Sequence, residues 1–161
     1  MYPASGASRY RLASRKGPRF KPGADAWVAA DFRALERRVE LLQAYSHEGQ
    51  VWLDTGGFVT DVSSSAARLT GYDPPFYLGR HLLELAQPEE QPALAEKLAR
   101  LAAEPATPAI HHGRFADAQG NWHWAEAVIA NHLADQAVQA IIVHFRDVTQ
   151  SRQSEEERRQ A

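Results

Sequence analysis

The chain of 161 residues contains no cysteine. This absence excludes a disulfide framework, a thiolate zinc site, a cysteine nucleophile and any photochemistry that needs a cysteinyl adduct. The sequence also lacks a run of about 18 apolar residues, the length that a membrane-spanning helix needs, and its N-terminus lacks the apolar core of a secretory signal. We therefore expect a soluble, cytoplasmic protein without a membrane span.

Acidic residues are missing from the first 24 positions, which carry Arg9, Arg11, Arg15, Lys16, Arg19 and Lys21. Since the net charge of the chain is −2, this arm carries +6 and the remainder carries −8 (−2 minus +6). Glycine, proline and serine fill the gaps, which predicts a disordered arm over residues 1–24. Such an arm could hold nucleic acid or an anionic membrane surface. Solvated chain is the more common outcome, so we do not expect nucleic-acid binding.

An apolar pattern begins at residue 25, where the sequence predicts an amphipathic helix over residues 25–47 that flanks a single folded domain. Its apolar residues follow spacings of four, three, four and three, and we name them the seam: Val28, Phe32, Leu35, Val39 and Leu42. Two heptads fall short of the three or four that are typical of a coiled coil. The seam therefore covers either its own domain or the same helix of a second subunit.

The rest of the chain alternates between strand and helix patterns. Two β-rich stretches flank a turn at Asp54–Gly57, and three more follow after residue 108, the first two of them joined by a connection at Asp117–Gly120. Between these two groups lie a short helix ended by Gly71 and a longer one with Leu94 and Leu98 on its inward stripe. This order predicts an α+β domain, with one antiparallel sheet and helices on one face.

Several short strings occur in a defined order along this domain. They are "D..G" at Asp54 and Gly57, "ARLTGY" at 67–72, "LG" at 78–79, "PEE" at 88–90, "R...A.G.WHW.E" at 114–126 and "RDVT" at 146–149. Each string is weak alone, but their order and spacing over about residues 48–150 are specific. Together they resemble a PAS domain of the bacterial sensory-box type, with a C-terminal Asp-Val-Thr junction.

The resemblance implies a five-stranded antiparallel sheet over residues 48–149 that cups a small cavity under its helices. It also implies that the last strand passes a signal into a C-terminal helix, here beginning at residues 150–161. That tail has no apolar residue at heptad spacing after Val148, so it cannot hold a coiled coil by itself. It either leads toward an output domain, such as a histidine kinase or a cyclase, or ends a stand-alone module that acts as a homodimer.

Apolar residues of the predicted domain are candidates for lining that cavity, although they could also fill the core without leaving a hole. The candidates are Leu69, Phe76, Leu82, Leu83, Leu94, Leu98, Phe115, Ile129 and Phe145. A four-residue connection at Asp117–Gly120 predicts that Arg114 lies opposite His123 in its hairpin. The two residues would then share one face of the sheet.

The histidines are weak candidates for a metal site. His111 and His112 are adjacent in a predicted strand and so point to opposite faces, which prevents them from holding one ion together. PAS domains that bind haem carry the axial histidine on the long central helix, and "QPALAEKLARLAAE" contains none. We expect no metal site, no histidine-ligated haem on that helix and no cysteine-adduct flavin. Non-covalent flavin or another small apolar ligand stays open.

The string from Arg146 to Thr149 is the predicted signal junction. By resemblance, Asp147 pairs with a basic group of the core, and Thr149 fixes the start of the C-terminal helix. We hypothesise that the basic partner of Asp147 is Arg114. Apart from the resemblance, Asp147 or Thr149 suits the N-cap of that helix. Glu126, in a strand between apolar neighbours, needs a cation, and Arg114 and Arg146 are its candidates.

The sequence carries no nucleophile elbow, phosphate-binding loop or dinucleotide fingerprint, so we predict that the chain is not an enzyme. The resemblance implies a sensory and dimerisation module in signal transduction, as in a two-component system. The alternative is a stand-alone adaptor whose basic arm tethers it to nucleic acid or to an anionic surface.

Overall fold

A computed structural model describes residues 24–161, and describes side chains from residue 30 onward. These residues form a five-stranded antiparallel sheet in the order β2-β1-β5-β4-β3. The strands are β1 (Glu48–Leu53), β2 (Val59–Val62), β3 (Ala109–Ala116), β4 (Trp122–His132) and β5 (Ala140–Asp147). The predicted α+β fold is confirmed. The basic arm predicted over residues 1–24 lies outside the described residues, apart from Ala24.

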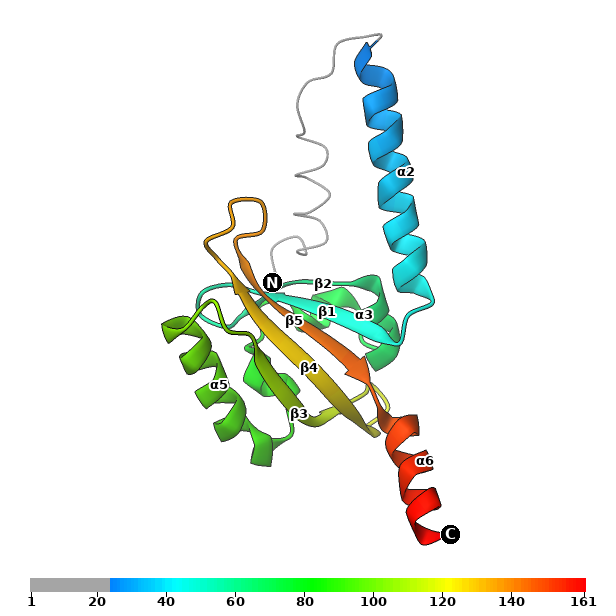
Figure 1. Ribbon diagram of the computed structural model, residues 1–161, viewed down its shortest axis with the longest axis vertical. Coiled ribbons are helices and arrows are strands. Elements are labelled where there is room, and N and C mark those ends of the chain that lie inside the picture. Colours follow the sequence, from blue (N-terminus) through cyan, green and yellow to red (C-terminus); the bar gives the residue numbers. More distant parts are fainter. Residues whose placement is uncertain (1–23) are drawn as a thin grey trace.

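The chain between β2 and β3 supplies a helical layer on one face of the sheet (Figure 1). Its elements are α3 (Ser64–Thr70), α4 (Pro74–Tyr77), the 3₁₀ turns η1 (Leu82–Leu85) and η2 (Pro88–Glu90), and α5 (Gln91–Ala103). The Ser63 side chain accepts a hydrogen bond from the Ala66 N–H at 3.1 Å and caps α3. Gly71 ends this helix with a φ of 75°, a conformation that a side chain would strain.

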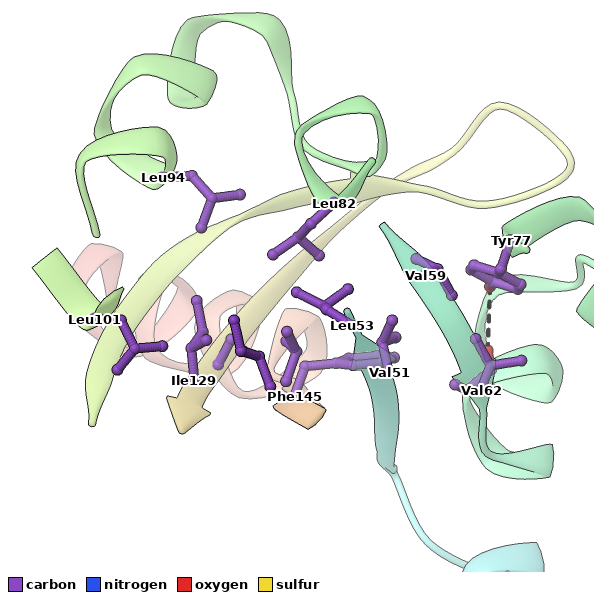
Figure 2. Packing of buried hydrophobic residues seen from close by; sticks show 14 residues of the cluster. Val51, Leu53, Val59, Val62, Tyr77, Leu82, Leu94, Leu101, Ile129 and Phe145 are labelled. Atoms are coloured by element: carbon purple, nitrogen blue, oxygen red, sulfur yellow. Dashed lines mark hydrogen bonds between the residues drawn. The ribbon is translucent and has the colours of Figure 1, made fainter. Parts of the chain in front are cut away.

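The core lies between the helical layer and the inner face of the sheet (Figure 2). Strand residues alternate between the two faces, so that Val51 and Leu53 of β1 are buried while Trp52 between them is not. Leu82 of η1 and Leu94 of α5 close the core from the helical side. Burial of each such side chain contributes about 1.5–3 kcal/mol.

The hairpin of β3 and β4 differs by one residue from the predicted register. Arg114 lies opposite Trp124, and Phe115 lies opposite His123. The reason is that the Asp117 N–H donates to the Asn121 carbonyl at 2.9 Å, which leaves a connection of three residues instead of four. Because strand side chains alternate, this shift of one residue turns His123 to the inner face and leaves Arg114 on the outer face.

Two helices flank the sheet: α2 (Ala24–Ala44) before β1 and α6 (Thr149–Gln160) after β5 (Figure 1). The predicted helices at both ends are confirmed. The first of them ends at Ala44, three residues earlier than expected, and Arg68 of α3 donates to the carbonyls of Gln43 and Ser46 beside this end, at 3.2 and 2.6 Å. A cation at this position donates hydrogen bonds to the free carbonyls at the end of a helix and is attracted by the negative end of the helix dipole.

The seam of α2 does not pack on its own domain, because the helix leaves the sheet and projects away from it (Figure 1). Phe32, Leu35, Val39 and Leu42 are 48, 58, 44 and 75% exposed. The side chain of Val28, the remaining seam residue, lies outside the described side chains. No helix within residues 24–161 is both long and apolar enough to cross a membrane.

Candidate functional site

A cavity of about 190 Å³ lies between the inner face of the sheet and the helical layer. Six of the nine candidate residues line it: Phe76, Leu82, Leu94, Phe115, Ile129 and Phe145. Leu69, Leu83 and Leu98 do not line it and instead pack against the core while partly buried. The sequence did not indicate which face of the sheet lines the cavity. The structure shows that it is the inner face, on which Phe115, Ile129 and Phe145 lie.

Polar-tipped aromatic residues of the cavity wall escaped the sequence analysis. Tyr72 stacks on Phe76 with ring centroids 3.7 Å apart, and Tyr77 meets Phe76 edge to face. The Tyr77 hydroxyl is hydrogen-bonded to Thr70, and burial raises the pKa of Tyr77 to about 12. The dense aromatic spacing in "TGYDPPFY" was the available signal for this wall.

His111 is a buried polar residue on the cavity wall that was also missed as a site residue. Its Nδ1 lies 3.2 Å from the Lys97 ammonium, and its Nε2 lies 4.0 Å from the Glu90 carboxylate. Glu90 is itself fixed, since its oxygens accept the Arg114 backbone N–H at 2.8 and 3.1 Å. Burial, and then the charge of Lys97, lower the pKa of His111. The imidazole is therefore neutral at neutral pH.

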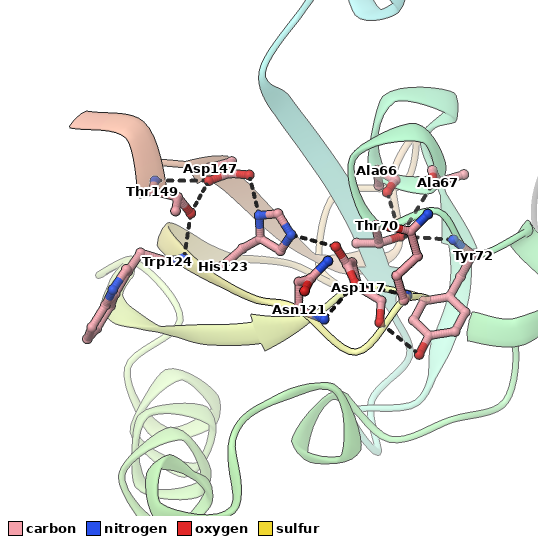
Figure 3. Close-up of polar contacts among 11 residues, drawn as sticks. Ala66, Ala67, Thr70, Tyr72, Asp117, Asn121, His123, Trp124, Asp147 and Thr149 are labelled. Atoms are coloured by element: carbon pink, nitrogen blue, oxygen red, sulfur yellow. Dashed lines mark hydrogen bonds and ion pairs between the residues drawn. The ribbon is translucent and has the colours of Figure 1, made fainter. Parts of the chain in front are cut away.

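The signal junction is organised around Asp147 (Figure 3). One carboxylate oxygen accepts from the backbone N–H and the hydroxyl of Thr149 at 2.9 and 2.6 Å. The Thr149 hydroxyl oxygen accepts from the Trp124 N–H, and the Val148 N–H donates to the Trp124 carbonyl, both at 2.9 Å. The first turn of α6 is thus fixed to β4 as well as to β5. Neither Asp147 nor Thr149 is the N-cap residue, which is Val148.

The basic partner of Asp147 is His123, and the hypothesised pair with Arg114 is replaced. His123 Nδ1 lies 3.1 Å from Asp147, and its Nε2 lies 2.8 Å from Asp117 (Figure 3). Only the imidazolium can donate to both carboxylates at once. The hydrogen bond from His123, and then the backbone N–H of Asn121, lower the pKa of Asp117 to about 2. The corrected hairpin register is what brings His123 to this position.

Arg114 takes part in a different contact with α6. Its Nε donates to the Gln87 side chain at 2.8 Å, and its guanidinium lies 5.1 Å from the ring centroid of Trp124. Arg152 of α6 lies 4.0 Å from the same ring. Trp124 therefore links an arginine of the edge strand β3 to the first turns of α6.

The segment that follows α2 meets the end of β5 beside this junction. The Asp147 N–H donates to the carbonyl of His47 at 3.1 Å, and Glu48 lies opposite Arg146 in the sheet. Of the two cations proposed for Glu126, Arg146 is the one that lies beside it, at 3.9 Å. Asp147 is consequently joined to α6, to β4 and to the segment that follows α2.

The other histidines do not form a metal site. His81 accepts the Leu83 N–H at 3.2 Å and lies 2.9 Å from the Gly56 carbonyl, so that it fixes the start of η1. His111 is buried and His112 is exposed, as expected for neighbours in a strand. Among the side chains described, those of residues 30–161, no three histidines, aspartates or glutamates are grouped to hold a metal ion.

Comparison with known proteins identifies the family. The family model described as the PAS fold matches residues 46–153, more than half of the chain. No curated protein matches the sequence. Among solved structures, the PAS domain of a protein from Colwellia psychrerythraea is 19% identical, with a TM-score of 0.60 over 73% of this chain and 98% of that one. The PAS domain of an HTR-like protein from Haloarcula marismortui is 18% identical, with a TM-score of 0.60 over 73% and 95%.

The chain belongs to the PAS-fold family. Domains of this family are generally sensory and signalling modules without catalytic activity. They commonly dimerise or pair with output domains.

Proposed function

We propose that this chain is a non-catalytic sensory and dimerisation module of cytoplasmic signal transduction. A small molecule in the cavity, or a bound partner, changes the junction at Asp147, and α6 passes the change to an output domain or partner such as a histidine kinase or a cyclase. Such a ligand must bind two states of the junction with different affinities, because equal affinity shifts no equilibrium.

The observation that carries the proposal is the position of Asp147. One of its oxygens holds His123 on the inner face, and the other holds the first residue of α6. His123 stacks on Phe115, which lines the cavity, with ring centroids 5.2 Å apart. A displacement of Phe115 therefore reaches α6 through only two intervening side chains. This short chain of packed contacts supports transfer from the cavity to the tail.

The homodimer is proposed from the surface of α2. Large apolar side chains that are 44–75% exposed along one helix face are costly in water and are typical of an interface. The same helix of a second copy offers a matching face, since a two-fold dimer pairs identical surfaces. The seam of α2 is then the contact between subunits.

Hydrogen exchange on a variant with a filled cavity tests the proposed transfer. Ala127 of β4 is buried and lines the cavity, so Ala127→Leu fills part of it. Ala130→Leu is the matched control, because the same change falls on the outer face of the same strand. We expect Ala127→Leu alone to change the exchange rates of the amides at 148–152. Equal rates in both variants would contradict transfer from the cavity.

A further inference from the structure

The cavity has the size of a small ring compound. An apolar cavity of about 150 Å³ in another protein binds benzene, and pockets for drug-sized ligands begin at about 300 Å³. At about 190 Å³, this cavity accommodates one or two rings. Its wall is rich in aromatic side chains, including Tyr72, Phe76, Phe115 and Phe145, which favour offset or edge-to-face contacts with a ring.

One hydrogen-bond donor on this wall has no partner at hydrogen-bond distance. Lys97 has only donors, so the Nδ1 of His111 accepts from it and the proton of the neutral ring is on Nε2. This Nε2 lies 4.0 Å from the Glu90 carboxylate, which is beyond hydrogen-bond distance. Gly113 leaves room for the ring, since a Cβ there would lie 2.6 Å from Nε2. His111 therefore offers one N–H at the cavity wall.

The charges around His111 disfavour ionic ligands. The Glu90 carboxylate lies 4.0 Å from Nε2 and repels an anion that binds there. Lys97 lies on the other side of the ring and repels a cation. A neutral acceptor, such as a carbonyl oxygen, meets neither repulsion.

We infer that the cavity binds a neutral aromatic compound of one or two rings that carries a single hydrogen-bond acceptor, which the Nε2–H of His111 recognises. The inference rests on the proposed sensory function and specifies its ligand class. The adjacent His112 provides a natural control because it faces away from the cavity.

Calorimetric titration with four probes of similar size tests the inference: acetophenone, ethylbenzene, benzoate and benzylamine. We expect acetophenone to bind about fivefold to tenfold more tightly than ethylbenzene, the effect of one hydrogen bond, and both ions to bind more weakly than acetophenone. His111→Phe should remove this preference, while His112→Phe and the conservative His111→Gln, which keeps a side-chain donor, should retain it. Ala127→Leu should weaken binding of both neutral probes, because it fills the cavity.

The possible failures are distinguishable. Equal binding of acetophenone and ethylbenzene, or a preference that survives in His111→Phe, would overturn the ligand class and leave the cavity as a binding site. Tighter binding of benzoate or benzylamine would overturn the requirement for a neutral ligand. If neither neutral probe binds the folded protein, both the ligand class and the proposed small-molecule sensing by this cavity fail.

Discussion

The two flanking helices leave the same end of the sheet, yet they differ in surface and in attachment. The α2 helix exposes a row of large apolar side chains, and a hydrogen bond from Arg68 to the Gln43 carbonyl attaches its last turn to the domain. The α6 helix exposes polar residues throughout, and Asp147 and Trp124 hold its first turn. An apolar surface suits permanent association, whereas a polar helix held by a few hydrogen bonds can be released at low cost. In this account α2 joins subunits and α6 carries the signal.

Charge placed in the seam of α2 should have the largest effect. Leu35→Glu introduces a pair of buried carboxylates into a two-fold dimer and removes two buried leucines, at about 1.5–3 kcal/mol each. We expect the dimer dissociation constant to rise at least about 100-fold, as measured by sedimentation equilibrium. Arg37→Glu, which introduces the same residue on the opposite side of the helix, is the control. Wild-type protein that stays monomeric would contradict the role of α2.

Removal of the Asp147 side chain should affect α6 more than the rest of the domain. Asp147→Ala loses hydrogen bonds to Thr149 and leaves His123 without its partner at the junction. We expect the free energy of unfolding in urea to fall by about 2 kcal/mol, with faster amide exchange along α6. Asp135→Ala, which removes a similar carboxylate from an exposed turn, is the control. Unchanged exchange in α6 would show that the junction does not hold the helix.

Loss of the Arg152 side chain should have a smaller effect on the same helix. Arg152→Ala removes the contact with the Trp124 ring, which is worth about 0.5–1 kcal/mol at an exposed site. Helicity of α6 should decrease, as followed by amide exchange of residues 150–156. Arg158→Ala changes the same residue type near the end of the helix and should leave those rates unaltered.

The smallest effect on α6 is expected from acid, because Asp117 reaches the helix only through His123. The pKa of Asp117 is lowered from 3.8 to about 2. Its stabilising contribution is therefore complete above about pH 4 and is lost as pH falls through about 2, where the folded protein must also take up the proton. Urea titrations at several pH values give the free energy of unfolding as a function of pH. Between about pH 2 and pH 4, this free energy should depend less steeply on pH in Asp117→Asn than in the wild type. An unchanged slope would exclude the bond between Asp117 and His123.

Local signals in the sequence predicted most of the fold. Ser63 and Gly71 mark the ends of α3 because caps depend on neighbouring residues only. The register of the β3–β4 hairpin was wrong because it depends on whether Asp117 pairs with Asn121, a choice between connections that differ by one residue. The register decides which side chains share a face of the sheet. For this reason the error of one residue also prevented prediction of the contact between His123 and Asp147.

The candidate site was less predictable than the fold. Phe115 and Phe145 were found because inward aromatic residues of strands line any space under the helices. His111 could not be assigned, because its role depends on Lys97 and Glu90, which approach from other elements. The sequence also could not show what covers the seam of α2. The same apolar spacing occurs in a helix that packs on its own domain and in one that packs on a second subunit.

A double-mutant cycle between the cavity and the junction tests most directly the claim that Asp147 links the two. Amide exchange of residues 148–156 would be measured in Ala127→Leu, in Asp147→Ala and in the double variant. If the change travels through Asp147, Ala127→Leu should have no further effect on α6 once Asp147 is removed, and the two effects will be strongly non-additive. Additive effects, within about 0.5 kcal/mol, would contradict the claim and mean that cavity and tail are independent.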